Sequence, residues 1–354
     1  MWKDDWPTAR QALSDWWGGR GLAVCVTAPK DEPWEPVPAP PIPDRLEDRW
    51  LDPVYRVQAA LHELAHTYCG GVAFPLLATD VGPGSLGLFL GCAGRLDETT
   101  VWYEPCIGDP ESAGPLALDV EGRWWRRHVA LIAEATRCAD GRCLVGMPDL
   151  IENLDTLAQL RGPQQVLLDL VERPNWVAER IQEINAAFFR AFDAFRQPIA
   201  DEAGGNSWGA FRLWGPGRTA KVQCDIGCAI SPAMFRRVVQ PALAEQCEWL
   251  DFAMFHLDGT NAIPQLDNLL AIDSLRAIEW TPQAGLPGGG APEWYPLYRR
   301  IRSGGKAVQA VEVLPVEVEP LIDAVGPEGL FIMTHTATEA EARDLLRRTG
   351  WPGA

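Results

Sequence analysis

The stretch that decides the fold is FAMFHLD at residues 252–258, an apolar run that ends in two potential metal ligands, His256 and Asp258. A short apolar run bounded by polar residues is typical of a strand buried in a parallel sheet. Four further runs in the second half of the chain end in the same way, in an acid, a cysteine or a histidine. They are 221–225 with Cys224 and Asp225, 277–280 with Glu279, 307–313 with Glu312, and 330–334 followed by His335.

Similar apolar runs at 22–28, 72–78 and 143–147 bring the number of predicted strands to eight, and amphipathic segments separate them. This alternation predicts an α/β fold, and no glycine-rich phosphate loop follows the first run. We therefore expect a (β/α)₈ TIM barrel rather than an open doubly wound sheet. The barrel would be a single domain over residues 1–354, with residues 1–52 forming an N-terminal extension and the first strand.

In a barrel, the carboxyl ends of all strands meet at one mouth, where barrel active sites lie. The polar ends of the second-half strands are therefore expected to converge there. The proline-rich segment DEPWEPVPAPPIPD (31–44) cannot form regular structure, and we expect it to be one of the loops that cover the mouth.

Composition excludes several classes of function. The net charge of −17 disfavours nucleic acid and anionic membranes as partners, because both require a positive surface. No apolar run is long enough to span a membrane and the N-terminus lacks an apolar leader, so a cytoplasmic protein is expected. Its nine cysteines are then predicted to be free thiols. A homodimer is compatible with the sequence.

Several stretches resemble the uroporphyrinogen decarboxylase-like superfamily, a group of TIM-barrel enzymes. This group includes the decarboxylase and zinc-dependent methyltransferases that move methyl groups between small molecules, corrinoid proteins and coenzyme M. The stretches are TDVGPGSLGLFLG (79–91), NLDTLAQLRGPQQVLLDL (153–170), CDIGCAISPAMFRRVVQPAL (224–243), FHLDGTNAIPQLDNLL (255–270), AIEWTP (277–282) and SGGKAVQAVE (303–312). The resemblance implies the barrel fold, and it implies that Asp80 matches the catalytic aspartate of the group.

The departures from the family pattern indicate which branch is closer. The decarboxylase carries arginines after its first strand, whereas this chain has TAPKDEPWEP (27–36) with no arginine, so porphyrinogen decarboxylation is not expected. The methyltransferases hold zinc with a His-x-Cys and a later cysteine. Here Asp258 replaces the first cysteine after His256, and the later position falls on His335 or Glu312. Cys224 is a further, softer candidate.

The resemblance therefore implies zinc or a similar divalent ion, and imidazole and carboxylate are both accepted zinc ligands. A carboxylate-rich site acts better as a Lewis acid on an oxygen leaving group than as an activator of thiols. The structural alternative is that His256 and His335 only hydrogen-bond to carboxylates at the rim.

The leading hypothesis is a metal-assisted methyltransferase-like enzyme that acts on a small methylated substrate. The methyl group would pass to a corrinoid on a separate partner protein, because this chain has no corrinoid-binding domain. The metal or an acid such as Asp80 would polarise the leaving atom, and Asp225 and Glu279 would orient substrate or ligands. Aromatic side chains of Trp102, Trp208 and Trp280 would wall the pocket.

Two other hypotheses stay open. One is a lyase or decarboxylase for a small carboxylated or sugar-like substrate, in which Asp80 and His256 transfer protons and Glu104 assists as an acid. The other is a non-catalytic barrel that binds a ligand or docks a corrinoid protein.

Residues 62–66 read HELAH, which matches the HExxH pattern of zinc proteases. The stretch lies in the predicted helix 53–68 and lacks the continuation of the extended motif. Because such a helix flanks a barrel, we expect His62 and His66 to be partly exposed and distant from the mouth.

Overall fold

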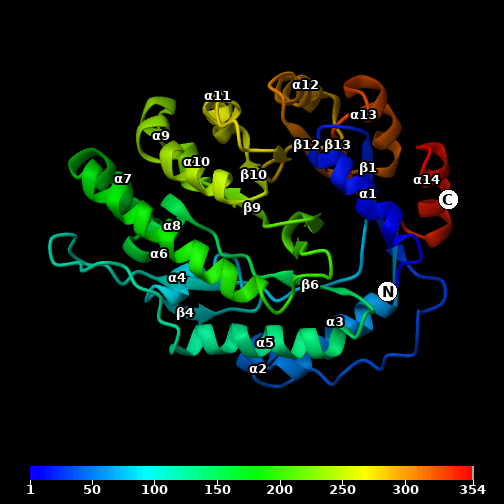
Figure 1. Cartoon of the computed structure of the whole chain (residues 1–354), viewed down its shortest axis with the longest axis horizontal. Coiled ribbons are helices and arrows are strands. Elements are labelled where there is room, and N and C mark those ends of the chain that lie inside the picture. Colours follow the sequence, from blue (N-terminus) through cyan, green and yellow to red (C-terminus); the bar gives the residue numbers. More distant parts are fainter. Residues whose placement is uncertain (353–354) are drawn as a thin grey trace.

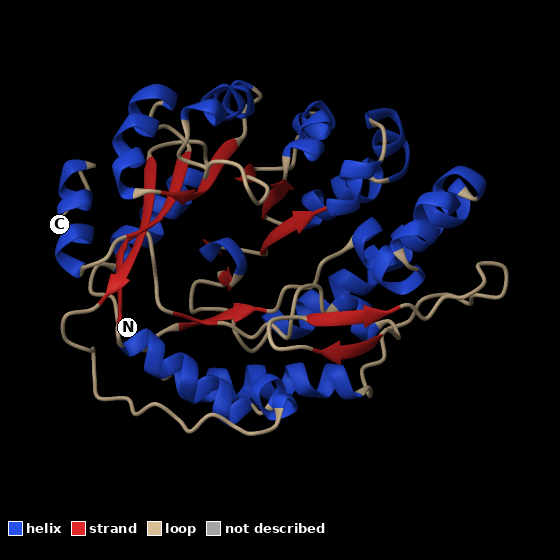
Figure 2. Ribbon diagram, turned by 180° about the vertical axis from the view of Figure 1, so that it is seen from behind, coloured by secondary structure: helices blue, strands red, loops and turns tan. Residues whose placement is uncertain are grey.

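The computed structural model describes residues 1–352, and it shows an α/β protein in which helices surround the strands (Figures 1 and 2). Within these residues, no helix combines the length and the apolar character needed to cross a bilayer. All nine cysteines are free thiols, as predicted.

All eight predicted strands are present, and five more short strands accompany them. The predicted strands are β1 (Leu22–Pro29), β3 (Leu76–Leu77), β6 (Leu144–Met147), β9 (Thr219–Gln223), β10 (Phe252–Asp258), β11 (Ala277–Thr281), β12 (Ala307–Val313) and β13 (Leu330–His335). The additional strands are β2 (Thr67–Gly71), β4 (Ala93–Leu96), β5 (Val101–Glu104), β7 (Asn206–Trp208) and β8 (Leu213–Gly215).

The strand ladders do not form the closed ring of the predicted barrel. They make a seven-stranded sheet in the order β2-β1-β13-β12-β11-β10-β9 and a four-stranded sheet in the order β3-β6-β7-β8, and β4 pairs with β5 alone. From β1 to β9 the neighbours in the larger sheet are parallel, while β2 joins β1 antiparallel. Over residues 1–352 the hydrogen-bonded sheets are therefore open and mixed.

Fourteen α-helices are present in the described residues. They are α1 (Trp6–Trp17), α2 (Leu46–Leu51), α3 (Pro53–Ala65), α4 (Leu86–Phe89), α5 (Arg123–Ala139), α6 (Asn153–Arg161), α7 (Pro163–Glu172), α8 (Pro174–Arg196), α9 (Pro232–Val238), α10 (Gln240–Trp249), α11 (Leu266–Leu270), α12 (Tyr295–Ser303), α13 (Val318–Val325) and α14 (Glu339–Arg348). The helices that follow β9 to β13 lie on the outer side of the larger sheet (Figure 1).

The ends of these helices follow local sequence signals. Ser231 caps α9 by accepting a hydrogen bond from the Met234 N–H, and Thr338 caps α14 by accepting one from the Glu341 N–H. The single helix expected over 231–248 is instead two helices, α9 and α10, because Pro241 lies at the second position of α10, where it starts a new helix.

The proline-rich segment has no regular structure, as predicted, but its contacts are with α3. Trp34 N–H donates to the Ala65 carbonyl, and the Val37 carbonyl oxygen lies 2.7 Å from Nδ1 of His62. The segment therefore packs along the C-terminal end of α3, and the expected role as a cover over the mouth is replaced by this contact.

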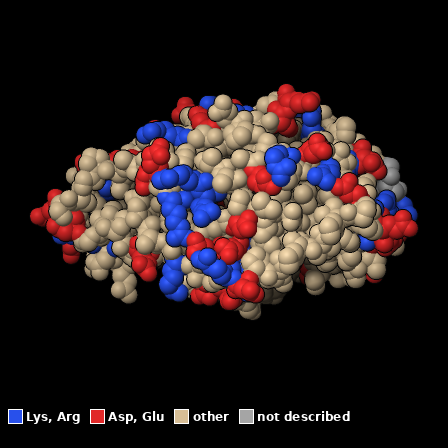
Figure 3. Space-filling view, turned by 90° about the horizontal axis from the view of Figure 1, so that it is seen from below, with Lys and Arg blue, Asp and Glu red and all other residues tan. Residues whose placement is uncertain are grey.

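The face of the molecule in Figure 3 carries both signs of charge, with a central group of basic side chains bordered by acidic ones. The charge of −17 is therefore not spread as one uniform acidic field on this face. A further cationic side chain, Arg212, lines a groove beside the strand ends.

Candidate functional site

The C-terminal ends of β9 and β10 bring three potential ligand atoms together. Asp225 follows β9, His256 and Asp258 lie on β10, and their candidate atoms all lie within 4.8 Å of one another. Within residues 1–352, this is the only group of three His, Cys, Asp or Glu side chains that meets this distance. One imidazole nitrogen and two carboxylates suit a hard or borderline divalent ion.

The parallel register explains why His256 is held by a carboxylate. His256 on β10 lies opposite Glu279 on β11, and its Nδ1 is 2.5 Å from Oε2 of Glu279. Glu279 has no exposed surface, and its other oxygen accepts a 2.7 Å hydrogen bond from the Thr281 hydroxyl. With Nδ1 engaged, Nε2 of His256 is left for a ligand, which is the arrangement of metal-bound histidines held by a carboxylate.

Asp225 is held from below by a second acid. Its backbone N–H donates to the Asp155 carboxylate at 2.7 Å, and its own carboxylate accepts from Nε2 of Gln223 at 2.8 Å. Gln223 lies opposite His256 on the next strand, so the amide of Gln223 joins the Asp155 and Asp225 side of the site to the His256 row. The three ligand candidates thus rest on a hydrogen-bonded base.

Lys221 connects this base to Asp80. The buried Lys221 ammonium donates to the Asp149 carboxylate at 2.9 Å and to Oε1 of Gln223. The Asp149 backbone N–H in turn donates to Oδ1 of Asp80 at 2.6 Å. Asp80 and Asp149 line a cavity of about 350 Å³ together with Gly209 and Ala210. Asp80 therefore lies on its own cavity, linked to the ligand group through Lys221.

The acids outnumber the cations here, and several hold their protons more tightly than usual. Burial and the Asp149 charge raise the pKa of Asp80 to about 6. Burial raises the pKa of Glu152 to about 8. Asp225 has solvent-exposed surface, but the protein around its carboxylate partly removes it from water. This desolvation, followed by the Asp155 charge, raises the pKa of Asp225 to about 7. A cluster of carboxyl groups whose pKa values lie near neutral pH is typical of sites for metal ions or proton transfer.

The two cations respond to these acids. Burial acts to lower the pKa of Lys221, but the Asp149 and Glu152 carboxylates outweigh burial and raise it. Burial likewise opposes the charged form of His256, and the hydrogen bond and charge of Glu279 raise its pKa. Burial raises the pKa of Glu279 itself, against the effect of His256. Both pKa values are raised, so the His256–Glu279 pair holds its proton more tightly than either isolated side chain would.

A strained turn lies beside the ligand group. Phe211 and Arg212 both have positive φ values, 62° and 49°, which side chains other than glycine rarely adopt. The turn is held by Gln309, whose Nε2 donates to the Phe211 carbonyl, and the Phe211 ring centroid lies 4.8 Å from that of His256. Strain of this kind persists where the surroundings fix it, often at functional sites.

Three of the predicted metal ligands are not members of the ligand group. His335 is exposed and its Nδ1 lies 3.1 Å from the Thr27 hydroxyl. Glu312 is exposed on an irregular stretch of β12, with φ 54°. Cys224 is buried, and burial raises its thiol pKa well above the ordinary value, which disfavours the thiolate needed for metal binding.

The predicted aromatic wall is wrong. Trp208 and Trp280 have no exposed surface, and they pack against Phe192 and Trp294. The reason is strand alternation: Glu279 points to the site, so Trp280 points to the opposite face. Trp102 is 52% exposed on the separate β4–β5 hairpin, where it donates to Asp97, and Glu104 is exposed on the same strand.

Two residues near the site are aromatic, but they are not tryptophans. Phe211 contacts His256, as described above. Tyr103 lies between Trp102 and Glu104 on β5 and donates its hydroxyl to the Pro83 carbonyl, in the loop that carries Asp80. Burial raises its pKa, and the Asp149 charge adds to this effect. The Tyr103 side chain thus contacts the Asp80 loop at Pro83, which lines the Asp80 cavity.

The HELAH histidines lie closer to the strand ends than predicted. His62 and His66 line a groove of about 490 Å³ with His335, Thr27 and Arg212, at the carboxyl ends of β1 and β13. The expectation that α3 keeps both histidines distant from the mouth is therefore wrong. The C-terminal end of α3 leads directly into β2, which pairs with β1 and brings this end of the helix to the rim.

The sequence contained signals for the residues that were missed. Lys221, Gln223 and Asp225 alternate along one strand, so they share a face. Asp149, Glu152 and Asp155 recur at intervals of three after β6, although acids after a strand are common and carry little specificity. What could not be foreseen is that the two sets meet through Lys221 and Gln223.

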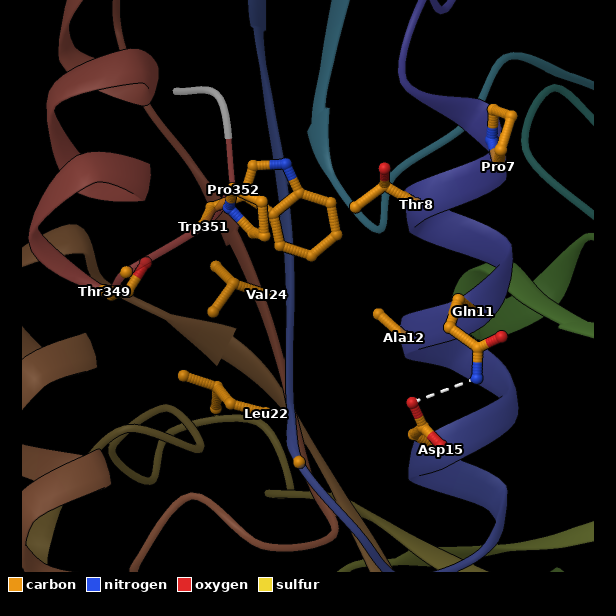
Figure 4. A pocket seen from close by; sticks show the side chains of 12 residues that line it. Pro7, Thr8, Gln11, Ala12, Asp15, Leu22, Val24, Thr349, Trp351 and Pro352 are labelled. Atoms are coloured by element: carbon orange, nitrogen blue, oxygen red, sulfur yellow. Dashed lines mark hydrogen bonds between the residues drawn. The ribbon is translucent and has the colours of Figure 1, made fainter.

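A further, larger cavity lies elsewhere. It measures about 650 Å³ and lies between α1, the start of β1 and the C-terminal residues up to Pro352 (Figure 4). Its one ionisable side chain, Asp15, already accepts a hydrogen bond from Gln11. It opens at the amino ends of the strands, and it lacks the convergent titratable groups of the β9–β10 site.

The chain matches no protein-family model, and a search of curated proteins finds no similar sequence. The candidate site consequently rests on its geometry: an Asp225–His256–Asp258 ligand group, a Glu279 carboxylate that orients the imidazole, and a buried network that reaches Asp80.

Proposed function

We propose that this protein is a metal-assisted methyltransferase-like enzyme, built on a (β/α)₈ barrel, that removes a methyl group from the oxygen of a small methylated substrate. The observation that carries the proposal is the Asp225–His256–Asp258 group, with Nδ1 of His256 bound to Glu279. Zinc or a similar divalent ion would be held by these three side chains.

The barrel is supported by the junction between the two sheets. Nδ2 of Asn206 on β7 donates to the Thr219 carbonyl on β9 at 2.9 Å, and the Thr219 N–H donates to Oδ1 of Asn206 at 3.0 Å. One side chain thus supplies the pair of bonds that a backbone ladder would make. The β7–β8 hairpin fills the place between the third and fourth predicted strands, β6 and β9.

The chemistry follows from the donor set. When bound, a divalent ion held by oxygen and one imidazole supplies Lewis acidity to an oxygen leaving group. Glu279 keeps the imidazole in the tautomer whose Nε2 faces the site, and Asp155 and Gln223 hold Asp225 in place. Asp80, with a pKa of about 6, is an acid outside the ligand group that can donate the proton the oxygen requires.

In the reaction, the bond between the methyl carbon and the substrate oxygen breaks. A reduced corrinoid on a separate protein would accept the methyl group and would provide the electron pair for the new bond to the methyl carbon. The oxygen keeps the electrons of the broken bond and takes the proton from Asp80. The acceptor follows from the resemblance to the methyltransferase branch, and the proposed metal ligands do not depend on it.

The test combines metal analysis with turnover. Purified protein that carries His66→Ala, which removes one of the helix histidines from the groove at the ends of β1 and β13, is expected to hold one equivalent of zinc or manganese. His256→Ala and Asp258→Asn should each remove this metal, and the parent protein should demethylate a methoxylated probe such as methoxybenzoate with a reduced corrinoid protein. Glu312→Gln is the matched control, because Glu312 is an exposed acid outside the group. Metal that stays bound in both His256→Ala and Asp258→Asn, each made in the His66→Ala protein, would overturn the proposed site.

A lyase is the second candidate, and the cavity at Asp80 favours it. Asp80 and Asp149 share a cavity lined by glycine and proline, and Asp80 titrates near 6, where an acid can both take and give a proton. This alternative predicts turnover of a carboxylic acid by metal-free protein, with both Asp80→Asn and His256→Ala inactive because each removes a proton-transfer group.

A further inference from the structure

The groove at the ends of β1 and β13 contains three histidines that the proposed reaction does not use. His62 lies on α3, His66 is the residue that ends α3, and His335 ends β13. All three line the same groove of about 490 Å³, together with Glu63 and Thr67. The chain has five histidines, so three of the five lie in one groove.

The hydrogen bonds of His62 and His66 fix which ring nitrogen is free. Nδ1 of His62 lies 2.7 Å from the Val37 carbonyl oxygen, and Nδ1 of His66 lies 2.7 Å from the His62 carbonyl oxygen. A carbonyl oxygen only accepts, so each Nδ1 carries the hydrogen in these contacts. In the neutral ring, Nε2 is then an unprotonated acceptor on both residues.

The two rings are neighbours, with centroids 4.5 Å apart and planes inclined by 52°. Their spacing of four residues places both on the same face of the helix end. Imidazoles whose Nδ1 is bound to a backbone carbonyl are the usual form of histidine metal ligands, because the bond fixes the tautomer and the ring orientation. The pair is therefore preorganised for a shared ligand.

The surroundings hold the pair in place. The Lys30 N–H donates to the His66 carbonyl at 2.8 Å and the Trp34 N–H donates to the Ala65 carbonyl at 2.9 Å, so the proline-rich segment ties down the last turn of α3. The same segment supplies the Val37 carbonyl that binds His62. A segment with no regular structure thus determines the tautomer of one histidine and the position of the other.

A metal ion fits this arrangement better than an anion does. Arg212 lines the groove and would attract an anion, but its guanidinium donates to the Phe74 carbonyl and the neutral histidines present acceptors rather than donors. An anion would require imidazolium rings, whereas a transition ion uses the tautomer already present. Imidazole ligands suit Zn²⁺, Cu²⁺ and Ni²⁺.

We propose that His62 and His66 form a second metal site, for a borderline transition ion such as Cu²⁺, Ni²⁺ or Zn²⁺, with His335 as an additional ligand across the groove. The site is distinct from Asp225–His256–Asp258, which is the only three-ligand group within 4.8 Å among residues 1–352. Two nitrogens are therefore preorganised, and the exposed His335 side chain completes the set by rotating toward them.

The experiment uses the full chain with His256→Ala, which removes the mouth site and leaves the groove intact. After dialysis against a chelator, Ni²⁺ and Cu²⁺ are titrated at pH 7.5 by calorimetry. We expect one equivalent to bind, with an affinity at least tenfold lower after His66→Ala and several-fold lower after His335→Ala. Thr67→Ala is the matched control, because Thr67 lines the same groove and offers no ligand to these ions.

Copper provides an independent measure. The nitrogen hyperfine pattern of bound Cu²⁺ in electron paramagnetic resonance is expected to report at least two imidazoles and to lose one with His66→Ala. His66 is exposed, so its replacement should leave the melting temperature within about 2 °C, and His66→Gln provides a second variant. Unchanged affinity in both His66 variants, no binding by the His256→Ala protein, or binding of phosphate in place of the metal overturns the proposal.

The two metal proposals fail separately. His256→Ala should remove only the mouth equivalent, and His66→Ala should remove only the groove equivalent. A chain that loses all metal with His256→Ala refutes the groove site and leaves the proposed function standing.

Discussion

The carboxylate of Glu279 offers the sharpest test of the candidate site, through the substitution Glu279→Gln. Glutamine keeps the shape of the side chain, and its amide oxygen can still accept from Nδ1 of His256. Its NH2 group then faces the Thr281 hydroxyl, which turns to accept, so the main change is the loss of the negative charge. The Nδ1–Oε2 distance is 2.5 Å and Glu279 is fully buried, so water does not screen the pair. The variant therefore isolates what the negative charge contributes to the ligand.

The magnitude follows from the hydrogen bond. A hydrogen bond to a charged group contributes about 1.5–3 kcal/mol and a neutral one about 0.5–1.5 kcal/mol. Loss of the charge should therefore weaken the hydrogen bond that orients the His256 imidazole by about 1.5 kcal/mol. About 1.4 kcal/mol corresponds to a tenfold change in affinity. We expect zinc affinity at the mouth to fall about tenfold at pH 7.5, within the range of changes typical of residues that orient metal ligands.

The pH dependence adds a second expectation. Glu279 raises the pKa of His256, so protons compete with the metal in the parent protein as the pH falls. In Glu279→Gln the pKa of His256 drops because burial then dominates, and this competition weakens. The affinity gap between parent and variant should therefore narrow from pH 7.5 to pH 6.

The assay is competition of zinc with a chromogenic chelator, in a His66→Ala background that removes the groove histidine. Glu312→Gln serves as the control and should change affinity less than twofold. An unchanged affinity in Glu279→Gln, or a larger loss in Glu312→Gln, would refute the role of Glu279 as the carboxylate that orients His256.

Three further predictions concern the network and the core. Lys221→Met removes the buried cation between Asp149 and Gln223 and should lower the free energy of unfolding by about 3–5 kcal/mol at pH 8. The loss should be smaller at pH 5, because Glu152, with its pKa of about 8, is then already protonated. Urea denaturation at both pH values tests this, and equal losses would contradict it. Asp80→Asn should stabilise the protein by about 1–2 kcal/mol at pH 8 and have little effect near pH 4. The raised pKa of Asp80 makes its ionisation unfavourable in the folded protein, and this penalty grows as the pH rises toward 6. Thermal melting as a function of pH measures the effect, and a variant less stable than the parent at pH 8 would contradict the raised pKa of Asp80. Trp280→Ala should cost about 3–5 kcal/mol, whereas the exposed Trp102→Ala should change stability by less than about 0.5 kcal/mol; similar values for both in chemical denaturation would mean that the burial of Trp280 is wrong.

Local signals in the sequence were sufficient for the strands and their polar ends. The run FAMFHLD predicts β10, and the same layout predicts β9, β11, β12 and β13, because a strand's apolar length is a property of its own residues. Helix ends at Ser231 and Thr338 were equally predictable, since an N-cap involves neighbours within three residues. The convergence of Asp225, His256 and Asp258 follows from parallel strands that end at one edge.

Partners between distant strands required the tertiary structure. Sequence spacing gives no register, and register is what places Glu279 beside His256 and Gln223 on its other side. The side chain of Trp280 was predicted to wall the pocket because it lies at the end of a predicted strand, yet alternation directs Glu279 and Trp280 to opposite faces. No backbone ladder joins β7 to β9, and the Asn206 side chain bridges them instead, which also could not be foreseen.

The sequence by itself therefore determined eight of the strands, where their chelating ends lie, and that the second half of the chain carries the ligand candidates. Tertiary structure decided which of those candidates meet, which tryptophans are buried, and that the helix-borne His62 and His66 share a groove with His335. The physical reason is range: hydrophobic pattern and capping act over a few residues, whereas a site needs side chains from distant segments within a few ångströms of one another.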